Sequence, residues 1–207
     1  MSNVADRQTL MTAERFASGF TYESYKAQMT QNRARFEKFE RENVLRDEDV
    51  QPFRRLPRAL STVVITEDWC SDAVATLPLV AALAERSGKL DVRIILRDQN
   101  LDLMDAHLNK GRFRSIPTVI FYDDEWNEIG AWLEKPVSIA ELRVRLRLEI
   151  YASDPAFGSP DAPSSELPDA VRERLWAAIT KMRDDTTPES NREVLRELRE
   201  LLLERER

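Results

Sequence analysis

The 207-residue chain is 42% hydrophobic and carries a formal net charge of −6, which predicts one well-buried core with extensions. The acidic average charge disfavours binding to nucleic acid or to an anionic membrane, because both surfaces repel it. No stretch approaches the roughly 20 apolar residues of a transmembrane helix, and the sequence Met1 to Arg7 is unlike a signal peptide, so we expect a cytoplasmic protein.

The N-terminal part of the chain is predicted to be helical. Aromatic and apolar side chains recur at mostly helical intervals from Thr12 to Asn43. Pro52 and Pro57 then interrupt the pattern, because proline removes a backbone donor from a helix interior. We therefore expect an N-terminal helical arm over residues 1–57.

A parallel β-α-β unit is expected next. Residues 61–66 form a short β-branched run of the kind that is buried on both faces of a parallel sheet. A helix is predicted over residues 73–87, ended by Gly88, and a second strand over residues 92–96. A right-handed crossover is the natural connection between two such strands.

The remaining predicted elements complete a mixed sheet. A helix is expected over residues 98–108, followed by a hairpin of strands 117–122 and 128–133 and by a helix from Ser138 to about Tyr151. The order β-α-β-α-β-β-α predicts an α/β domain, with a mixed central sheet flanked by helices, over residues 58–152.

The C-terminal part is predicted to begin with a linker. Pro, Ser, Asp and Gly are frequent in residues 153–167. Helices are expected over residues 168–184 and 188–206, the second with a narrow leucine stripe. We therefore expect a C-terminal helical hairpin over residues 168–207, and the helical arms offer surfaces for a homo-oligomer.

The only cysteine, Cys70, follows the first predicted strand and precedes a helix. Helix N-termini favour thiolate through their N–H groups and macrodipole. Asp72 opposes this with a second negative charge and either handles protons or merely stabilises the helix. Ala73 stands where a two-cysteine redox motif has its second sulfur, so no intramolecular disulfide can form. One cysteine and one histidine do not form a recognisable zinc-binding motif, and we expect no metal or cofactor.

Basic residues are expected around this thiol. Arg97 ends the second predicted strand, where α/β proteins bind ligands, and Arg112 and Arg114 precede a proline turn. Together they predict a positive rim for the carboxylates of a small thiol such as glutathione or bacillithiol. The alternative is that Arg97 pairs with surface acids. Similarly, Cys70 is either reactive or a small packed side chain beside Trp69, which is expected to shield it.

Two separated motifs resemble the thioredoxin superfamily: Trp69-Cys70 after a buried strand, and Ser115-Ile116-Pro117-Thr118 before a hairpin. The fuller pattern Trp-Cys-x-Asp-Ala, the stretch Leu96 to Asp105 and Arg-Ser-Ile-Pro is similar to a group of bacterial thioredoxin-like proteins with a single cysteine. The resemblance covers residues 60–148. It implies a thioredoxin-like fold in which Pro117 is cis and lies near Cys70.

Departures from the superfamily patterns restrict the chemistry. Val64 replaces the buried acid of thioredoxins, Glu67 replaces the threonine or serine of peroxiredoxins, and Cys70 to Ala73 does not match the monothiol glutaredoxin motif. The proton-transfer role of the missing acid is unfilled unless Asp68 or Asp72 takes it.

Two functions remain open from the sequence. In the first, the Cys70 thiolate attacks a disulfide and an external thiol resolves the mixed disulfide. The backbone of Ile116 and Pro117 then aligns an extended substrate, with Trp69, Arg97 and Arg114 at its sides. The partner is a disulfide-containing protein or a low-molecular-weight thiol. In the second, the chain is a non-catalytic thioredoxin-fold module that binds peptides or proteins.

Overall fold

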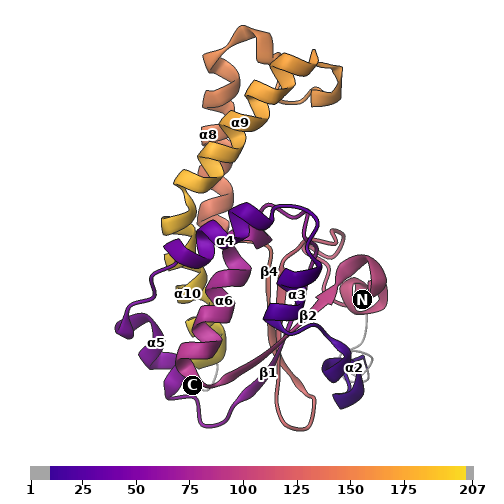
Figure 1. Ribbon diagram of the computed structural model, residues 1–207, viewed down its shortest axis with the longest axis vertical. Helices are drawn as coiled ribbons and strands as arrows, with labels where there is room; N and C mark the ends of the chain where they lie inside the picture. The colour runs from indigo at the N-terminus through magenta and orange to yellow at the C-terminus, as the bar shows by residue number, and fades with distance from the viewer. Residues whose placement is uncertain (1–9, 204–207) are drawn as a thin grey trace. The chain divides into compact units, whose positions relative to one another are not determined.

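The structure is a computed structural model that describes residues 10–203 (Figure 1). Met1 to Arg7 and the last residues of the helix expected over 188–206 lie outside the described residues. The described chain forms two compact units. The first comprises residues 10–134 and 194–203, and the second comprises residues 135–193. Between residues 10 and 203, every helix is too short or too polar to cross a membrane.

The first unit contains a four-stranded mixed sheet with the strand order β2-β1-β3-β4. The strands are β1 (Leu60–Thr66), β2 (Leu90–Leu96), β3 (Thr118–Tyr122) and β4 (Glu128–Leu133). β1 pairs in parallel with β2 and antiparallel with β3, which pairs antiparallel with β4. Helix α6 (Ala73–Ser87) connects β1 to β2. The predicted α/β class, a mixed sheet flanked by helices, is confirmed.

Strand β1 is buried on both faces. Val64 belongs to a first apolar cluster together with Leu77 of α6, whereas Val63 and Ile65 belong to a second cluster with Leu103. Successive side chains of a strand point to opposite faces, so each of these neighbours enters a different core. The apolar run of residues 63–65 in β1 follows from this burial, because neither face of the strand meets water there.

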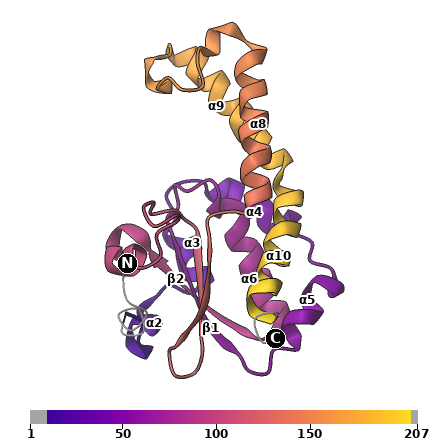
Figure 2. The same ribbon diagram turned by 180° about the vertical axis from the view of Figure 1, so that it is seen from behind.

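Helices from distant parts of the chain cover the first face of the sheet (Figures 1 and 2). They are α3 (Tyr22–Gln28), α4 (Arg33–Glu42), α5 (Asp47–Arg54), α6 and the C-terminal part of α10 (Thr187–Leu203). From α10, Val194, Leu198 and Leu202 are buried in this cluster. The indole Nε1 of Trp132 in β4 also donates to Glu197 Oε2 of α10 at 2.7 Å.

Shorter elements cover the second face. They are α2 (Ala13–Ser18), the 3₁₀ turn η1 (Arg97–Gln99) and α7 (Leu101–Asp105). Arg15 of α2 binds both carboxylate oxygens of Asp102 in α7, at 2.7 and 2.8 Å. This two-point pairing fixes α2 against α7, because a guanidinium fork matches carboxylate geometry.

The expectation that Pro52 interrupts the helical pattern is wrong. α5 runs through Pro52 and ends at Arg54. Val50 and Phe53 of this short helix are almost completely buried in the first cluster. Burying two large apolar side chains contributes several kcal/mol, about as much as an interior proline costs.

The second unit contains α8 (Val137–Ser153) and α9 (Asp169–Asp185), joined by residues 154–168, and the N-terminal part of α10. The connection contains 3₁₀ turns η2 (Pro155–Phe157) and η3 (Ser164–Glu166). Its Phe157 is buried with Tyr151 of α8 and with Leu175 and Ile179 of α9. Part of the expected linker thus belongs to a small core. The predicted domain limits at residues 57, 152 and 167 stay a prediction.

Candidate functional site

Cys70 lies in the turn between β1 and α6, beside the segment that enters β3. Its N–H donates to the carbonyl of Glu67 at 3.1 Å, which closes the turn. Its thiol donates to the carbonyl of Ile116 at 3.2 Å, and the side chain is buried, with 8% exposed. The peptide bond between Ile116 and Pro117 is cis. The sheet topology thus brings the two motifs of the sequence together.

Asp72 occupies the N-cap position of α6, and its side chain makes no cap hydrogen bond to the helix. The helix begins at Ala73, so Cys70 lies two residues before the N-cap. The influence of a helix macrodipole falls off within the first turn. The stabilisation of a Cys70 thiolate by α6 is therefore weaker than the sequence argument assumed, and the thiol interacts with Ile116 instead.

Arg97 connects the segments of Trp69 and Arg114 at the edge of the sheet beside Cys70, which we call the Cys70 edge. Its guanidinium carbon lies 4.7 Å from the ring centroid of Trp69, and its Nη1 donates to the carbonyl of Arg114 at 3.4 Å. Its Nε donates to Asp98 at 2.9 Å. The pairing with a surface acid and the placement beside Trp69 therefore occur together. The cation–π contact supports the indole, which is 43% exposed and lies next to Cys70 in the chain.

The arginine side chains of the expected positive rim are largely paired with carboxylates. Arg114 binds Asp105 through two hydrogen bonds of 2.6 and 2.8 Å. These bonds lower the pKa of Asp105 and raise that of Arg114. Arg112 lies over the ring of Phe113, 4.6 Å from its centroid, and this ring is 48% exposed. The edge thus presents aromatic surface more than uncompensated positive charge.

The two acids that precede Trp69 have different environments. Asp68 accepts hydrogen bonds from the Thr30 N–H, the Thr30 hydroxyl and the Gln31 N–H, at 2.7, 3.0 and 3.1 Å. Partial burial raises the pKa of Asp68, but these bonds outweigh it and leave the pKa below its usual value. Asp68 is thus a structural anion rather than a replacement for the acid of thioredoxins.

Glu67 is the acid at this edge with a raised pKa. Burial raises it more than the N–H of Asp98, which donates to Glu67 Oε1 at 2.8 Å, lowers it. A carboxyl with a raised pKa holds or accepts a proton closer to neutral pH. Its place beside the Cys70 turn makes Glu67 a better candidate for proton handling than Asp68.

Residues of the N-terminal segment that no sequence motif indicates support the Cys70 turn. Asn32 donates to the carbonyl of Asp68 at 2.9 Å, next to the contacts of Thr30 and Gln31. Tyr25 is buried and makes a side-chain hydrogen bond with Thr66. Burial and the nearby negative charges of Asp68, Glu67 and Cys70 raise its pKa. The sequence offers no signal for these contacts, because the partners lie more than 30 residues apart.

His107 has a structural environment. It is buried, with Nδ1 2.8 Å from the carbonyl of Leu103 and Nε2 3.0 Å from Glu128 Oε2. Within residues 10–203, His, Cys, Asp and Glu side chains form no group of three or more suited to holding a metal ion.

Comparison with known proteins gives a family match and two similar folds. A protein-family model described as "Thioredoxin" matches residues 19–147, more than half of the chain. No curated protein matches this chain. A solved structure of a protein of unknown function from Pseudomonas aeruginosa has 16% identity and a TM-score of 0.56, covering 89% of this chain and 99% of the other. An HIV epitope-scaffold has 17% identity and a TM-score of 0.54, covering 85% and 94%. At these identities the likeness concerns the fold alone.

Proposed function

This chain belongs to the thioredoxin family, and we propose that it carries out thiol–disulfide exchange with Cys70 as its single sulfur. The Cys70 thiolate attacks one sulfur of a disulfide, forming a mixed disulfide and releasing the other sulfur as a thiolate, which takes up a proton. A thiolate from solution then attacks the substrate sulfur of the mixed disulfide. This second step leaves a new disulfide and regenerates Cys70, so the electrons balance without a second cysteine.

The observation that carries the proposal is the place of the Cys70 sulfur, 3.2 Å from the carbonyl of Ile116. This position joins the only thiol of the chain to the segment that precedes Pro117 at one edge of the sheet. The contact is a hydrogen bond from the protonated thiol, which must break before the thiolate forms. The proposal therefore implies that the reaction rate rises with pH as the thiol ionises.

The same edge supports an extended substrate. Among the described residues, the N–H of Ile116 donates to no acceptor, and we infer that a substrate carbonyl accepts from it. Trp69 and Phe113 are both substantially exposed, and Arg97 and Arg114 connect their segments. A peptide that pairs with backbone groups here and packs on aromatic rings fits the strand-addition mode of recognition. We infer a disulfide-containing protein or a low-molecular-weight disulfide as the substrate.

A second candidate is a non-catalytic module that binds peptides at this edge. The burial of Cys70 favours it, because only 8% of the residue is exposed while the neighbouring Trp69 is 43% exposed. In that case the thiol is a packed side chain that fixes the Ile116 segment, and the aromatic surface alone binds the partner.

Intact-mass measurement with oxidised glutathione separates the two candidates. The native chain is incubated at pH 7 to 9, with Cys70→Ser as the matched control and a urea-unfolded sample as the control for reagent reactivity. Exchange predicts one glutathione adduct, formed faster than on the unfolded chain and removed by added reduced glutathione. Slower modification of the folded chain than of the unfolded chain contradicts exchange and leaves the binding module.

A further inference from the structure

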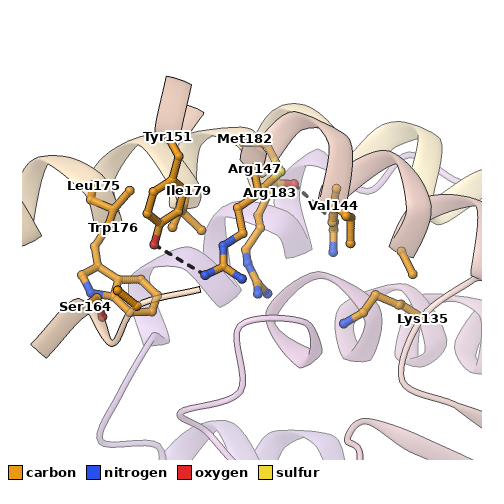
Figure 3. A pocket seen from close by; sticks show the side chains of 13 residues that line it. Lys135, Val144, Arg147, Tyr151, Ser164, Leu175, Trp176, Ile179, Met182 and Arg183 are labelled. Carbon is orange, nitrogen blue, oxygen red and sulfur yellow. Dashed lines mark hydrogen bonds between the residues drawn. The ribbon is translucent and has the colours of Figure 1, made fainter. Parts of the chain in front are cut away.

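The second unit contains a cavity of about 330 Å³ between α8, α9 and their connection (Figure 3). This volume lies within the range of small-molecule sites. The residues that line it all belong to this unit, and they include Lys135, Arg143, Arg147, Tyr151, Trp176 and Arg183. The cavity is thus built from one compact unit, separate from the Cys70 edge.

The lining is basic although the chain as a whole is acidic. Lys135, Arg143, Arg147 and Arg183 contribute four cationic side chains, and the lining contains no Asp or Glu, whereas the chain carries a net charge of −6. In Figure 3 the side chains of Arg147 and Arg183 extend from their two helices in the same direction. The charged side chains that line the cavity are therefore all basic, which favours an anionic ligand over a cationic one.

Arg147 is the cation best placed to bind an anion. Within residues 10–203, its guanidinium hydrogen-bonds only to uncharged oxygen atoms, the Pro160 carbonyl at 3.1 Å and the Tyr151 hydroxyl at 3.5 Å. By comparison, Arg143 is held by the Thr186 hydroxyl at 3.0 Å and the Arg183 carbonyl at 3.4 Å. A guanidinium bound to neutral acceptors keeps its charge available for a carboxylate or phosphate.

The rest of the lining is apolar and aromatic. Leu175, Ile179 and Met182 are buried, whereas Trp176 is 51% exposed and Val144 is also exposed. Exposed large apolar side chains at a cavity are suited to cover an apolar ligand body. The indole of Trp176 presents a flat face for an aromatic or aliphatic group beside the cations.

We propose that this cavity binds a small organic anion, in which a carboxylate, sulfonate or phosphate group is attached to an apolar or aromatic body. The anionic group binds Arg147, with Lys135 and Arg183 supplying additional positive charge. The apolar body packs against Trp176 and the buried side chains below it. This binding activity goes beyond the proposed exchange reaction and does not depend on Cys70.

Two matched fluorescent probes test the proposal on the full chain. They are 8-anilinonaphthalene-1-sulfonate and N-phenyl-1-naphthylamine, which share the aromatic body and differ in the sulfonate. We expect the anionic probe to bind at least about tenfold more tightly, since a charge-assisted hydrogen bond accounts for such a factor. Arg147→Met should weaken the anionic probe about fivefold to tenfold and leave the neutral probe within about twofold.

The matched control is Arg145→Met. Arg145 lies on the same helix, is exposed and does not line the cavity. Its substitution therefore changes the net charge as Arg147→Met does, without altering the cavity. Equal affinities of the two probes for the native chain overturn the proposal without any variant. Equal weakening by Arg145→Met and Arg147→Met also overturns it, because the effect is then one of net charge. Circular dichroism verifies that both variants keep their helices.

Discussion

Asp68→Asn should destabilise the first unit, because it weakens the attachment of the Cys70 turn to the N-terminal segment. The carboxylate accepts three hydrogen bonds from Thr30 and Gln31. A hydrogen bond to a charged group contributes about 1.5 to 3 kcal/mol, but the partial exposure of Asp68 reduces this value, and asparagine keeps one acceptor oxygen. We expect a loss of about 1 to 2 kcal/mol in the free energy of unfolding at pH 7.

The loss in the free energy of unfolding should depend on pH, in a direction set by the pKa shift of Asp68. Folding lowers the pKa of Asp68, so its contribution to stability is present above the unfolded value, about 4, and is lost as the pH falls through the lower folded value. The difference between the native chain and Asp68→Asn should therefore be largest near neutral pH and shrink below about pH 4.

Urea unfolding followed by tryptophan fluorescence measures this difference. A Trp176→Phe background removes the tryptophan of the second unit, so that Trp69, Trp126 and Trp132 report on the first. Asp124→Asn is the control, because Asp124 makes an exposed ion pair of 3.6 Å with Arg58 that contributes at most about 1 kcal/mol. Equal effects of the two substitutions, or a loss for Asp68→Asn that is as large at pH 3 as at pH 7, would refute the reasoning.

Two further stability predictions concern buried polar contacts. His107→Leu should cost about 2 to 3 kcal/mol and His107→Gln less, since leucine removes the buried contacts of His107 with the Leu103 carbonyl and with Glu128. Equal losses of the two variants in urea unfolding would contradict this. Trp132→Phe should lower the free energy of unfolding by about 1 to 2 kcal/mol, because it removes the 2.7 Å hydrogen bond to Glu197. It should also speed cleavage within α10 in limited proteolysis. Unchanged cleavage would show that this hydrogen bond does not hold the helix.

The local patterns of the sequence predicted the central elements well. The β-branched run of β1, the helix ended by Gly88 and the hairpin opened by Pro117 are each specified by neighbouring residues. The same patterns failed at Pro52, where burial of Val50 and Phe53 outweighs the preference of proline. Local preference decides an element only where packing does not oppose it.

The site was less predictable than the fold. The approach of Cys70 to Ile116 follows from the strand order, which the sequence does indicate. The attachment of Asp68 to Thr30 joins two polar residues with no pattern in common, and it emerges only when the N-terminal segment packs on the sheet. The basic cavity was also missed, because Arg183 lies on a different helix from Arg143 and Arg147 and part of the lining falls in a segment that resembled a linker.

The discontinuity of the first unit makes the second unit an insertion. The chain leaves the sheet-containing unit after Glu134 and returns to it at Val194, so both ends of the inserted segment are anchored in one host. Ending the chain at Glu134 would strip Leu198 and Leu202 from the first core and expose the surface that they cover. The core of the host unit is thus built from residues on both sides of the inserted segment. The architecture thus permits exchange of the inserted segment while the host retains its sulfur.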